Sequence, residues 1–136
     1  MSTKTLTLAI MDGPYESANS STAFRIIHAA LKRGHNVNVF AYEGAVNLTM
    51  KSQQPHANPV KGTSVEEENH PTTKDWIAAL FRFAEEKGAR LNWINCGLCV
   101  DERGAGESIE GPRRGGPKDF FEASVSSDAT LVIATR

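Results

Sequence analysis

The chain lacks the features that mark membrane-spanning and secreted proteins. No apolar run in its 136 residues approaches the roughly 18–20 residues that cross a bilayer. The first four residues, Met1-Ser2-Thr3-Lys4, have none of the apolar character of a secretory signal. These absences predict a cytoplasmic protein. Only two cysteines are present, and in that reducing compartment they are expected to serve metal, redox or catalytic chemistry rather than a structural disulfide.

The chain also lacks an excess of either charge, paired histidines and nucleotide-binding motifs. The sequence contains fifteen basic and sixteen acidic residues, and this balance disfavours nucleic acid as a direct partner. The four histidines are scattered, so no set of ligands completes a zinc site with the cysteines. Neither GxGxxG nor GxxxxGK[ST] occurs. We therefore expect no metal and no cofactor.

What the chain does contain is the composition of one globular domain over residues 1–136, with 40% hydrophobic and 23% charged residues. Apolar, β-rich segments predict strands at 5–11, 37–42, 91–95 and 130–134. Helical spacing and capping residues predict helices over 19–33, 44–50, 72–87 and from Pro117 onward, the last burying Phe120 with Phe121 or Ser124. Segment 51–71 is polar and predicts a long loop or lid, and the glycine-rich segment 104–116 predicts a second loop.

This alternation of strands and helices predicts an α/β layer fold with a mostly parallel sheet. In such sheets the functional crevice lies beyond the carboxyl ends of the strands. The segments Asp12–Ser20 and Tyr42–Gly44 and the residue Cys96 all follow strand ends. We therefore expect them to converge on one edge of the molecule.

Cys96 is the strongest candidate for chemistry. It ends an apolar strand and precedes Gly97, where a helix is expected to start, so unpaired backbone N–H groups and a helix dipole favour its thiolate. That role requires a sulfur atom that solvent can reach. The structural alternative is a small buried hydrophobic side chain at a strand end.

Three further features each have a functional and a structural interpretation. Cys99 completes a CxxC pair, as a second redox thiol or as a residue that packs its turn onto the sheet. The hydroxyl-rich loop from Asp12 to Ser21 either holds a phosphate, as in flavin mononucleotide sites, or caps the next helix. Four basic residues follow the cysteines: Arg103, Arg113, Arg114 and Lys118. The functional interpretation is that they bind an anionic sulfur species or an acidic partner, and the structural one is that they are solvated surface charge.

Taken in order, several motifs resemble the DsrE/DsrF-like (TusD-like) sulfur-relay family. The first strand ends in Gly13-Pro14-Tyr15 before a Ser/Ala-rich helix start, Ser17 to Phe24, and Gly34-His35 precedes the second strand, which ends Phe40-Ala41-Tyr42-Glu43-Gly44. A helix rich in Trp and Leu runs from Trp76 to Gly88, and Cys96 stands eight residues before the glycine of Arg103-Gly104. The similarity covers nearly the whole chain.

The resemblance implies a three-layer α/β/α sandwich, in a homo-oligomer (trimer or hexamer) or a hetero-oligomer with paralogues. It also implies that Cys96 carries a persulfide received from a donor protein and passed to an acceptor. Cys99 departs from the family pattern. We assign catalysis to Cys96 and Cys99 and partner or substrate binding to Tyr15, Ser17, Asn19 and Arg103. The alternatives are a non-catalytic scaffold subunit of a sulfur-relay or redox complex and a flavodoxin-like small-ligand-binding protein.

Overall fold

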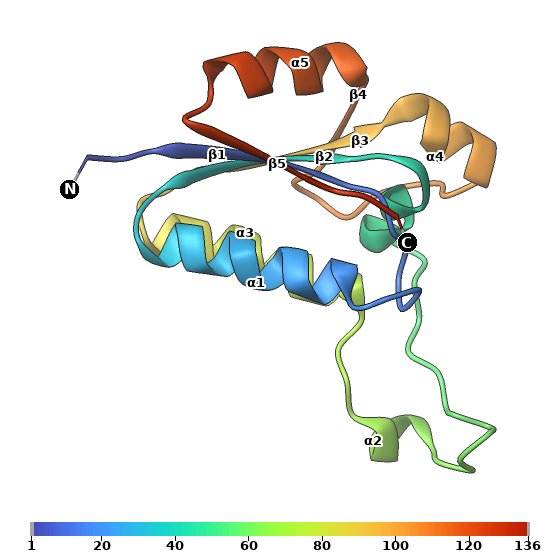
Figure 1. Cartoon of the computed structure of the whole chain (residues 1–136). Coiled ribbons are helices and arrows are strands. Elements are labelled where there is room, and N and C mark those ends of the chain that lie inside the picture. The colour runs from blue at the N-terminus through green and yellow to red at the C-terminus, as the bar shows by residue number, and fades with distance from the viewer. Residues whose placement is uncertain (1, 136) are drawn as a thin grey trace.

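The computed structural model describes residues 2–135. Within them, five parallel strands form one sheet in the order β4-β3-β2-β1-β5, with helices on both faces (Figure 1). The strands are β1 Thr5–Ile10, β2 Asn36–Ala41, β3 Leu91–Cys96, β4 Arg113–Gly115 and β5 Ala129–Ile133. The helices are α1 Asn19–Lys32, the 3-10 helix η1 Glu43–Thr49, α2 Val65–Glu68, α3 Thr73–Glu86, α4 Gly97–Arg103 and α5 Pro117–Ser126. The predicted α/β fold with a parallel sheet is confirmed.

The main core lies between one face of the sheet and the helices α1 and α3, which run side by side (Figure 1). The apolar residues of each helix recur at helical spacing and bury one stripe against the strands. Phe24 of α1 packs on Trp76 of α3 and on Trp93 of β3, with ring centroids 4.9 and 6.5 Å apart. This packing fixes α1 and α3 against the sheet.

The other face is covered by α4 and α5, and α5 covers it only in part (Figure 1). Within α5, Phe120 and Ser124 are half-buried and Phe121 is 65% exposed, so of the two residues expected beside Phe120 it is Ser124 that is partly covered. Phe120 stacks on Phe40 with ring centroids 5.6 Å apart. Leu131 and Val132 of the neighbouring edge strand β5 are exposed as well.

Segment 51–71 leaves the body of the protein and returns to it, and we call it the arm (Figure 1). The sequence predicts a loop or lid there, whereas the structure contains α2 within it. Ser64 caps this single turn, since its side chain accepts a hydrogen bond from the backbone N–H of Glu67 at 3.2 Å. Gln53 anchors the base of the arm because its buried side chain accepts a hydrogen bond from the backbone N–H of Lys74 at 3.0 Å.

The strand β4 is a second difference from the sequence prediction, which treats residues 104–116 as loop. Its three residues pair in parallel with the end of β3, and Asn95 lies opposite Arg114 and Cys96 opposite Gly115. Gly115 allows this approach, since a Cβ there would lie 2.5 Å from a methyl carbon of Ile94. The pairing brings the arginines of the glycine-rich segment beside the strand that ends in Cys96.

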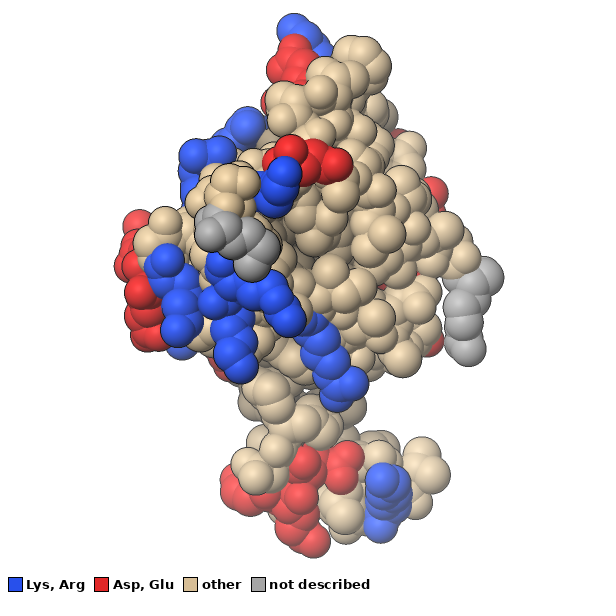
Figure 2. Space-filling view, turned by 60° about the vertical axis from the view of Figure 1, so that its left-hand side comes forward, with Lys and Arg blue, Asp and Glu red and all other residues tan. Residues whose placement is uncertain are grey.

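Basic side chains gather at the end of the sheet where the strands begin, opposite the end at which β3 reaches Cys96. Figure 2 shows lysines and arginines around this end of the molecule and acidic groups on the arm below. The basic residues at these strand starts and helix ends are Lys4, Lys32, Arg33, Lys87 and Arg90, all exposed. Among the described residues, no helix is long and apolar enough to cross a membrane.

Candidate functional site

The segments that follow β1, β2 and β3 meet at the carboxyl edge of the sheet, as the sequence predicts. The backbone N–H of Ala45 donates to the carbonyl oxygen of Met11 at 3.0 Å, which joins the first two segments. They touch so closely that a Cβ on Gly13 would lie 3.0 Å from the carbonyl oxygen of Gly44. The backbone N–H of Glu43 donates to Sγ of Cys99 at 3.2 Å, which joins the second segment to the third.

Cys96 is the last residue of β3 and the residue before α4, as expected. The sequence also predicts that solvent reaches its sulfur, and here the structure differs, because Cys96 is only 3% exposed. It belongs to a small apolar cluster on the α5 side of the sheet, together with Phe40, Val46, Ile94, Cys99 and Ala105. Tyr42, Val100 and Phe120 pack against this cluster from outside. The thiol is therefore buried in a cluster whose outer neighbours are half-buried side chains.

Cys99 lies one helical turn after Cys96 and is also buried. Burial, followed by a hydrogen bond with Cys96, raises the pKa of the Cys99 thiol. The backbone N–H of Glu43 and the charge of Arg103 act in the opposite direction. The structure thus places the two thiols in one buried cluster and favours the protonated form of Cys99.

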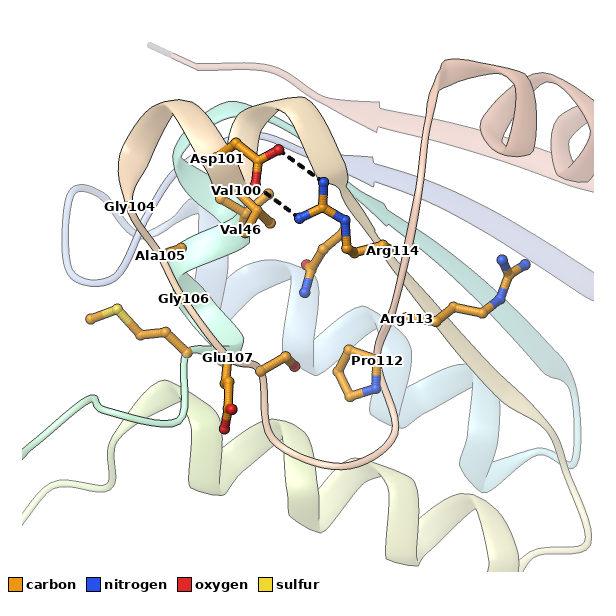
Figure 3. A pocket seen from close by; sticks show the side chains of 13 residues that line it. Val46, Val100, Asp101, Gly104, Ala105, Gly106, Glu107, Pro112, Arg113 and Arg114 are labelled. Carbon is orange, nitrogen blue, oxygen red and sulfur yellow. Dashed lines mark hydrogen bonds and ion pairs between the residues drawn. The ribbon is translucent and has the colours of Figure 1, made fainter.

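Arg114 and Asp101 form a two-pronged ion pair over the start of α4. Nη1 and Nη2 of Arg114 each donate to one carboxylate oxygen of Asp101 at 3.0 Å (Figure 3). This pairing lowers the pKa of Asp101 and raises that of Arg114. A Cβ on Gly97 would lie 2.8 Å from Nη2 of Arg114, so the guanidinium rests directly on the residue that follows Cys96.

A pocket of about 650 Å³ opens beside this ion pair (Figure 3). It lies between η1, α4 and the segment that returns from α4 to β4, and its lining includes Val46, Met50, Asn95, Asp101, Pro112 and Arg114. Cys96 does not line it. Asn95, the residue before Cys96, is held by two buried hydrogen bonds, one donated to Oγ1 of Thr49 at 2.8 Å and one accepted from Nε1 of Trp93 at 3.3 Å.

Ser17 and Asn19, which we assign to partner binding from the sequence, both donate hydrogen bonds to the buried carboxylate of Asp12, Asn19 from Nδ2 at 3.1 Å. Neither is the N-cap of α1, a position that Ala18 occupies. The carboxylate of Asp12 thus accepts from both of these side chains, and the hydroxyls of Ser20 and Ser21 donate to backbone carbonyl oxygens of the same loop. This arrangement favours a structural role for the loop over the phosphate site of a flavodoxin-like protein.

Tyr15 and Arg103 lie on either side of this edge. Tyr15 is exposed, with a left-handed backbone (φ 62°), and its hydroxyl donates to the carbonyl oxygen of Pro71 at 2.8 Å. It therefore links the first loop to the end of the arm. Burial, followed by the charge of Asp75, raises the pKa of Tyr15. Arg103 is exposed at the end of α4, and its charge reaches Cys99.

Within residues 2–135, no group of three or more His, Cys, Asp or Glu side chains is placed to hold a metal ion. The contacts that sequence reasoning does not identify are those of Asp101, of Gly97 and of the Glu43 backbone N–H. Arg114 appears in the sequence only as one of four basic residues. Its partner Asp101 lies thirteen positions away across a glycine-rich segment, a spacing without any helical or strand period, so only β4 reveals the pair.

Comparisons with known proteins agree with this architecture. The family model described as "DsrE/DsrF-like family" matches residues 4–133 of the chain. Among solved structures, the YchN protein from E. coli has a similar fold, with a TM-score of 0.69 and 17% sequence identity over 96% of this chain and 99% of that one. No curated protein sequence matches the chain.

Proposed function

This chain belongs to the DsrE/DsrF-like family, and we propose that it is a sulfur-relay protein in which Cys96 carries sulfane sulfur as a persulfide between partner proteins. The observation that carries this proposal is the position of Cys96, at the end of β3 with a second thiol in the same buried cluster and a guanidinium over the next residue. We place this relay in the cytoplasm, where both cysteines are reduced and free as in the structure.

The transfer consists of two thiol exchanges. The Cys96 thiolate attacks the outer sulfur of a donor persulfide, the donor S–S bond breaks, and the donor leaves as a thiolate. Cys96 then holds the sulfur as Cys96–S–SH. An acceptor thiolate attacks the same outer sulfur, takes it as a new persulfide and returns Cys96 to its thiolate form. No net oxidation or reduction occurs over the cycle.

Burial of Cys96 means that loading requires its cover to move. The cover consists of half-buried side chains that meet solvent on one side, Tyr42 and Phe120 among them. Their packing is local, because the stacked pairs Phe40–Tyr42 and Phe40–Phe120 belong to the small cluster and not to the main core. Displacing them leaves the sheet and the helices α1 and α3 intact. We propose that this cover opens transiently in the isolated protein, which admits small sulfur donors, and that partner proteins bind to the open form.

Cys99 gives the loaded state a second outcome. As a thiolate it attacks the inner sulfur of Cys96–S–SH, releases hydrosulfide and leaves a Cys96–Cys99 disulfide. Its raised pKa keeps this reaction slow near neutral pH. Protonated Cys99 therefore leaves the persulfide intact at rest, and deprotonated Cys99 releases hydrosulfide from it.

Self-association is part of the proposal. Exposed apolar side chains gather on the last two elements, Phe121 and Val125 on α5 and Leu131 and Val132 on β5, and we call them the C-terminal apolar residues. Within the described chain, β5 pairs only with β1, so its outer backbone groups have no strand partner. A second copy of this chain would cover both features.

The burial of Cys96 favours a second candidate function, a scaffold subunit that assembles a sulfur-relay or redox complex without carrying sulfur itself. The two candidates differ in one property of the purified protein. A carrier gains sulfane sulfur from a small donor, whereas a scaffold gains none.

Cyanolysis tests this difference. The reduced protein is incubated with inorganic polysulfide, desalted and treated with cyanide, which removes the outer sulfur of a persulfide as thiocyanate and restores the thiol. We expect one thiocyanate per chain from the wild type and from Cys99→Ser, and none from Cys96→Ser. Equal yields from wild type and Cys96→Ser would rule out the carrier and leave the scaffold.

A further inference from the structure

Arg114 lies beside the two residues that flank Cys96 in the sequence. The parallel pairing of β4 with β3 sets Arg114 opposite Asn95, the residue before Cys96, and turns its guanidinium over Gly97, the residue after it. Both flanking residues are buried, and the guanidinium is exposed. It therefore stands between solvent and the backbone of the residue that follows Cys96.

The guanidinium is fixed in this place and still has donors to offer. The carboxylate of Asp101 accepts one hydrogen bond from Nη1 and one from Nη2 of Arg114. A guanidinium has five N–H donors in all, so three remain, including the Nε–H, which lies 3.0 Å from the Cβ position of Gly97. The two-pronged geometry holds the plane of the guanidinium more firmly than a single bond would.

The guanidinium of Arg114, and not the carboxylate of Asp101, is the charged group that contacts the residue after Cys96. Its Nη2, Nε and Cζ are the three heavy atoms nearest to the Cβ position of Gly97, at 2.8, 3.0 and 3.1 Å. An anion that reaches Cys96 from this side therefore meets the positive member of the ion pair first.

We propose that Arg114 selects anionic sulfane-sulfur species for Cys96 and holds the outer sulfur of the Cys96 persulfide as its anion. This inference rests on the proposed function and names its substrate class: persulfide and polysulfide anions. Arg114 is a specificity-determining residue, and Asp101 is a positioning residue that acts through it.

Arg113 provides a matched control. It is the preceding residue of the same strand, carries the same charge and also lines the pocket, but its side chain points away from Asp101 (Figure 3). Its carboxylate contact is with Asp119, at 3.8 Å. Replacing Arg113 removes the same net charge as replacing Arg114 and leaves the contact over Gly97 in place.

Charge-selective alkylation tests the inference without any sulfur transfer. In a Cys99→Ser background, Cys96 is the only cysteine, and its alkylation rates with anionic iodoacetate and neutral iodoacetamide are compared. We expect Arg114→Gln to lower the ratio of the two rates about two- to fivefold, the range of an exposed charge pair. Arg113→Gln leaves the ratio unchanged, and Arg114→Lys restores part of it. Gly97→Ala, whose methyl group displaces the guanidinium, lowers the ratio with every charge retained.

An unchanged ratio in Arg114→Gln, or equal losses in Arg114→Gln and Arg113→Gln, would overturn the inference. Either result leaves the proposed function standing, because cyanolysis of the wild type measures sulfur loading independently. Failure of both reagents to modify Cys96 would count against both proposals, since each requires a small reagent to reach that sulfur.

Discussion

The backbone N–H of Glu43 donates a hydrogen bond of 3.2 Å to Sγ of Cys99, and this contact joins the end of β2 to the helix that follows β3. Glu43 adopts a left-handed backbone (φ 49°) to present that N–H group. The bond satisfies the sulfur of the second cysteine inside an apolar cluster. It also gives Cys99 a structural role beside its chemical one, so substituting Cys99 affects both the fold and the reactivity of the site.

The raised pKa of Cys99 predicts a loss of stability in the alkaline range. The folded protein keeps this thiol protonated, while the unfolded chain releases the proton at the ordinary value of about 8.5. Above that value the unfolded state binds fewer protons than the native state, so the free energy of unfolding falls as pH rises, and below it Cys99 contributes no pH dependence. Urea unfolding of wild type and Cys99→Ser between about pH 7 and about pH 10 measures the difference. Parallel curves for the two proteins would show that Cys99 is not the group responsible.

The cover over Cys96 predicts reactivity that depends on the size of the reagent. Phe120→Ala removes a stacked aromatic contact worth about 0.5–1.5 kcal/mol, which eases opening by about two- to tenfold. Alkylation of Cys96 by a bulky maleimide should accelerate by this factor, and alkylation by iodoacetamide should accelerate less. Val60→Ala changes a 95% exposed apolar side chain on the arm, outside the C-terminal apolar residues, and serves as the control. A similar acceleration in both variants would locate the opening elsewhere.

The close pairing of β4 with β3 predicts different tolerance at two neighbouring glycines. Gly115→Ala places a methyl group 2.5 Å from Ile94 and from the carboxylate of Asp119, and we expect it to cost about 1–3 kcal/mol of stability, as overpacking does. The Cβ of Gly116→Ala meets open space, and the loss at this N-cap position should stay below about 1 kcal/mol. Thermal or urea unfolding compares the two. Equal costs would contradict the described packing of β4.

The C-terminal apolar residues predict an assembly that one charge weakens. Phe121→Glu introduces a carboxylate at a side chain that is 65% exposed in the single chain. If a second copy covers it, the association constant falls by more than about tenfold, as for a lost aromatic anchor. Light scattering over a concentration series gives the mass. Val60→Glu alters a 95% exposed apolar residue on the arm and should leave the mass unchanged.

Much of the fold follows from patterns in the sequence. The apolar spacing of residues such as Phe24 and Leu31 predicts α1, and Gly34, at φ 79°, ends it where expected. Convergence of the strand ends follows from parallel topology alone. The strand β4 could not be predicted, because three residues rich in arginine and glycine carry no strand period. Its existence depends on the fit of Gly115 against Ile94, which is a tertiary contact.

In the candidate site too, local sequence predicts some features, and others depend on tertiary contacts. The position of Cys96 at a strand end could be predicted from local sequence, but its burial could not, since the residues that cover it come from distant segments such as Phe40 and Phe120. Ser17 and Asn19 look like free donors in the sequence because their partner, the Asp12 carboxylate, turns toward them only in the folded loop. The pairing of Arg114 with Asp101 likewise depends on β4.

Intact-mass measurement after exposure to polysulfide tests the central role of Cys96 most directly. The wild type and Cys99→Ser should each gain the mass of one sulfur atom, which reducing agent then removes, and Cys96→Ser should gain nothing. A wild-type mass that stays unchanged while the unfolded chain takes up sulfur would show that the folded protein keeps Cys96 closed to the donor, and would contradict the carrier function proposed here.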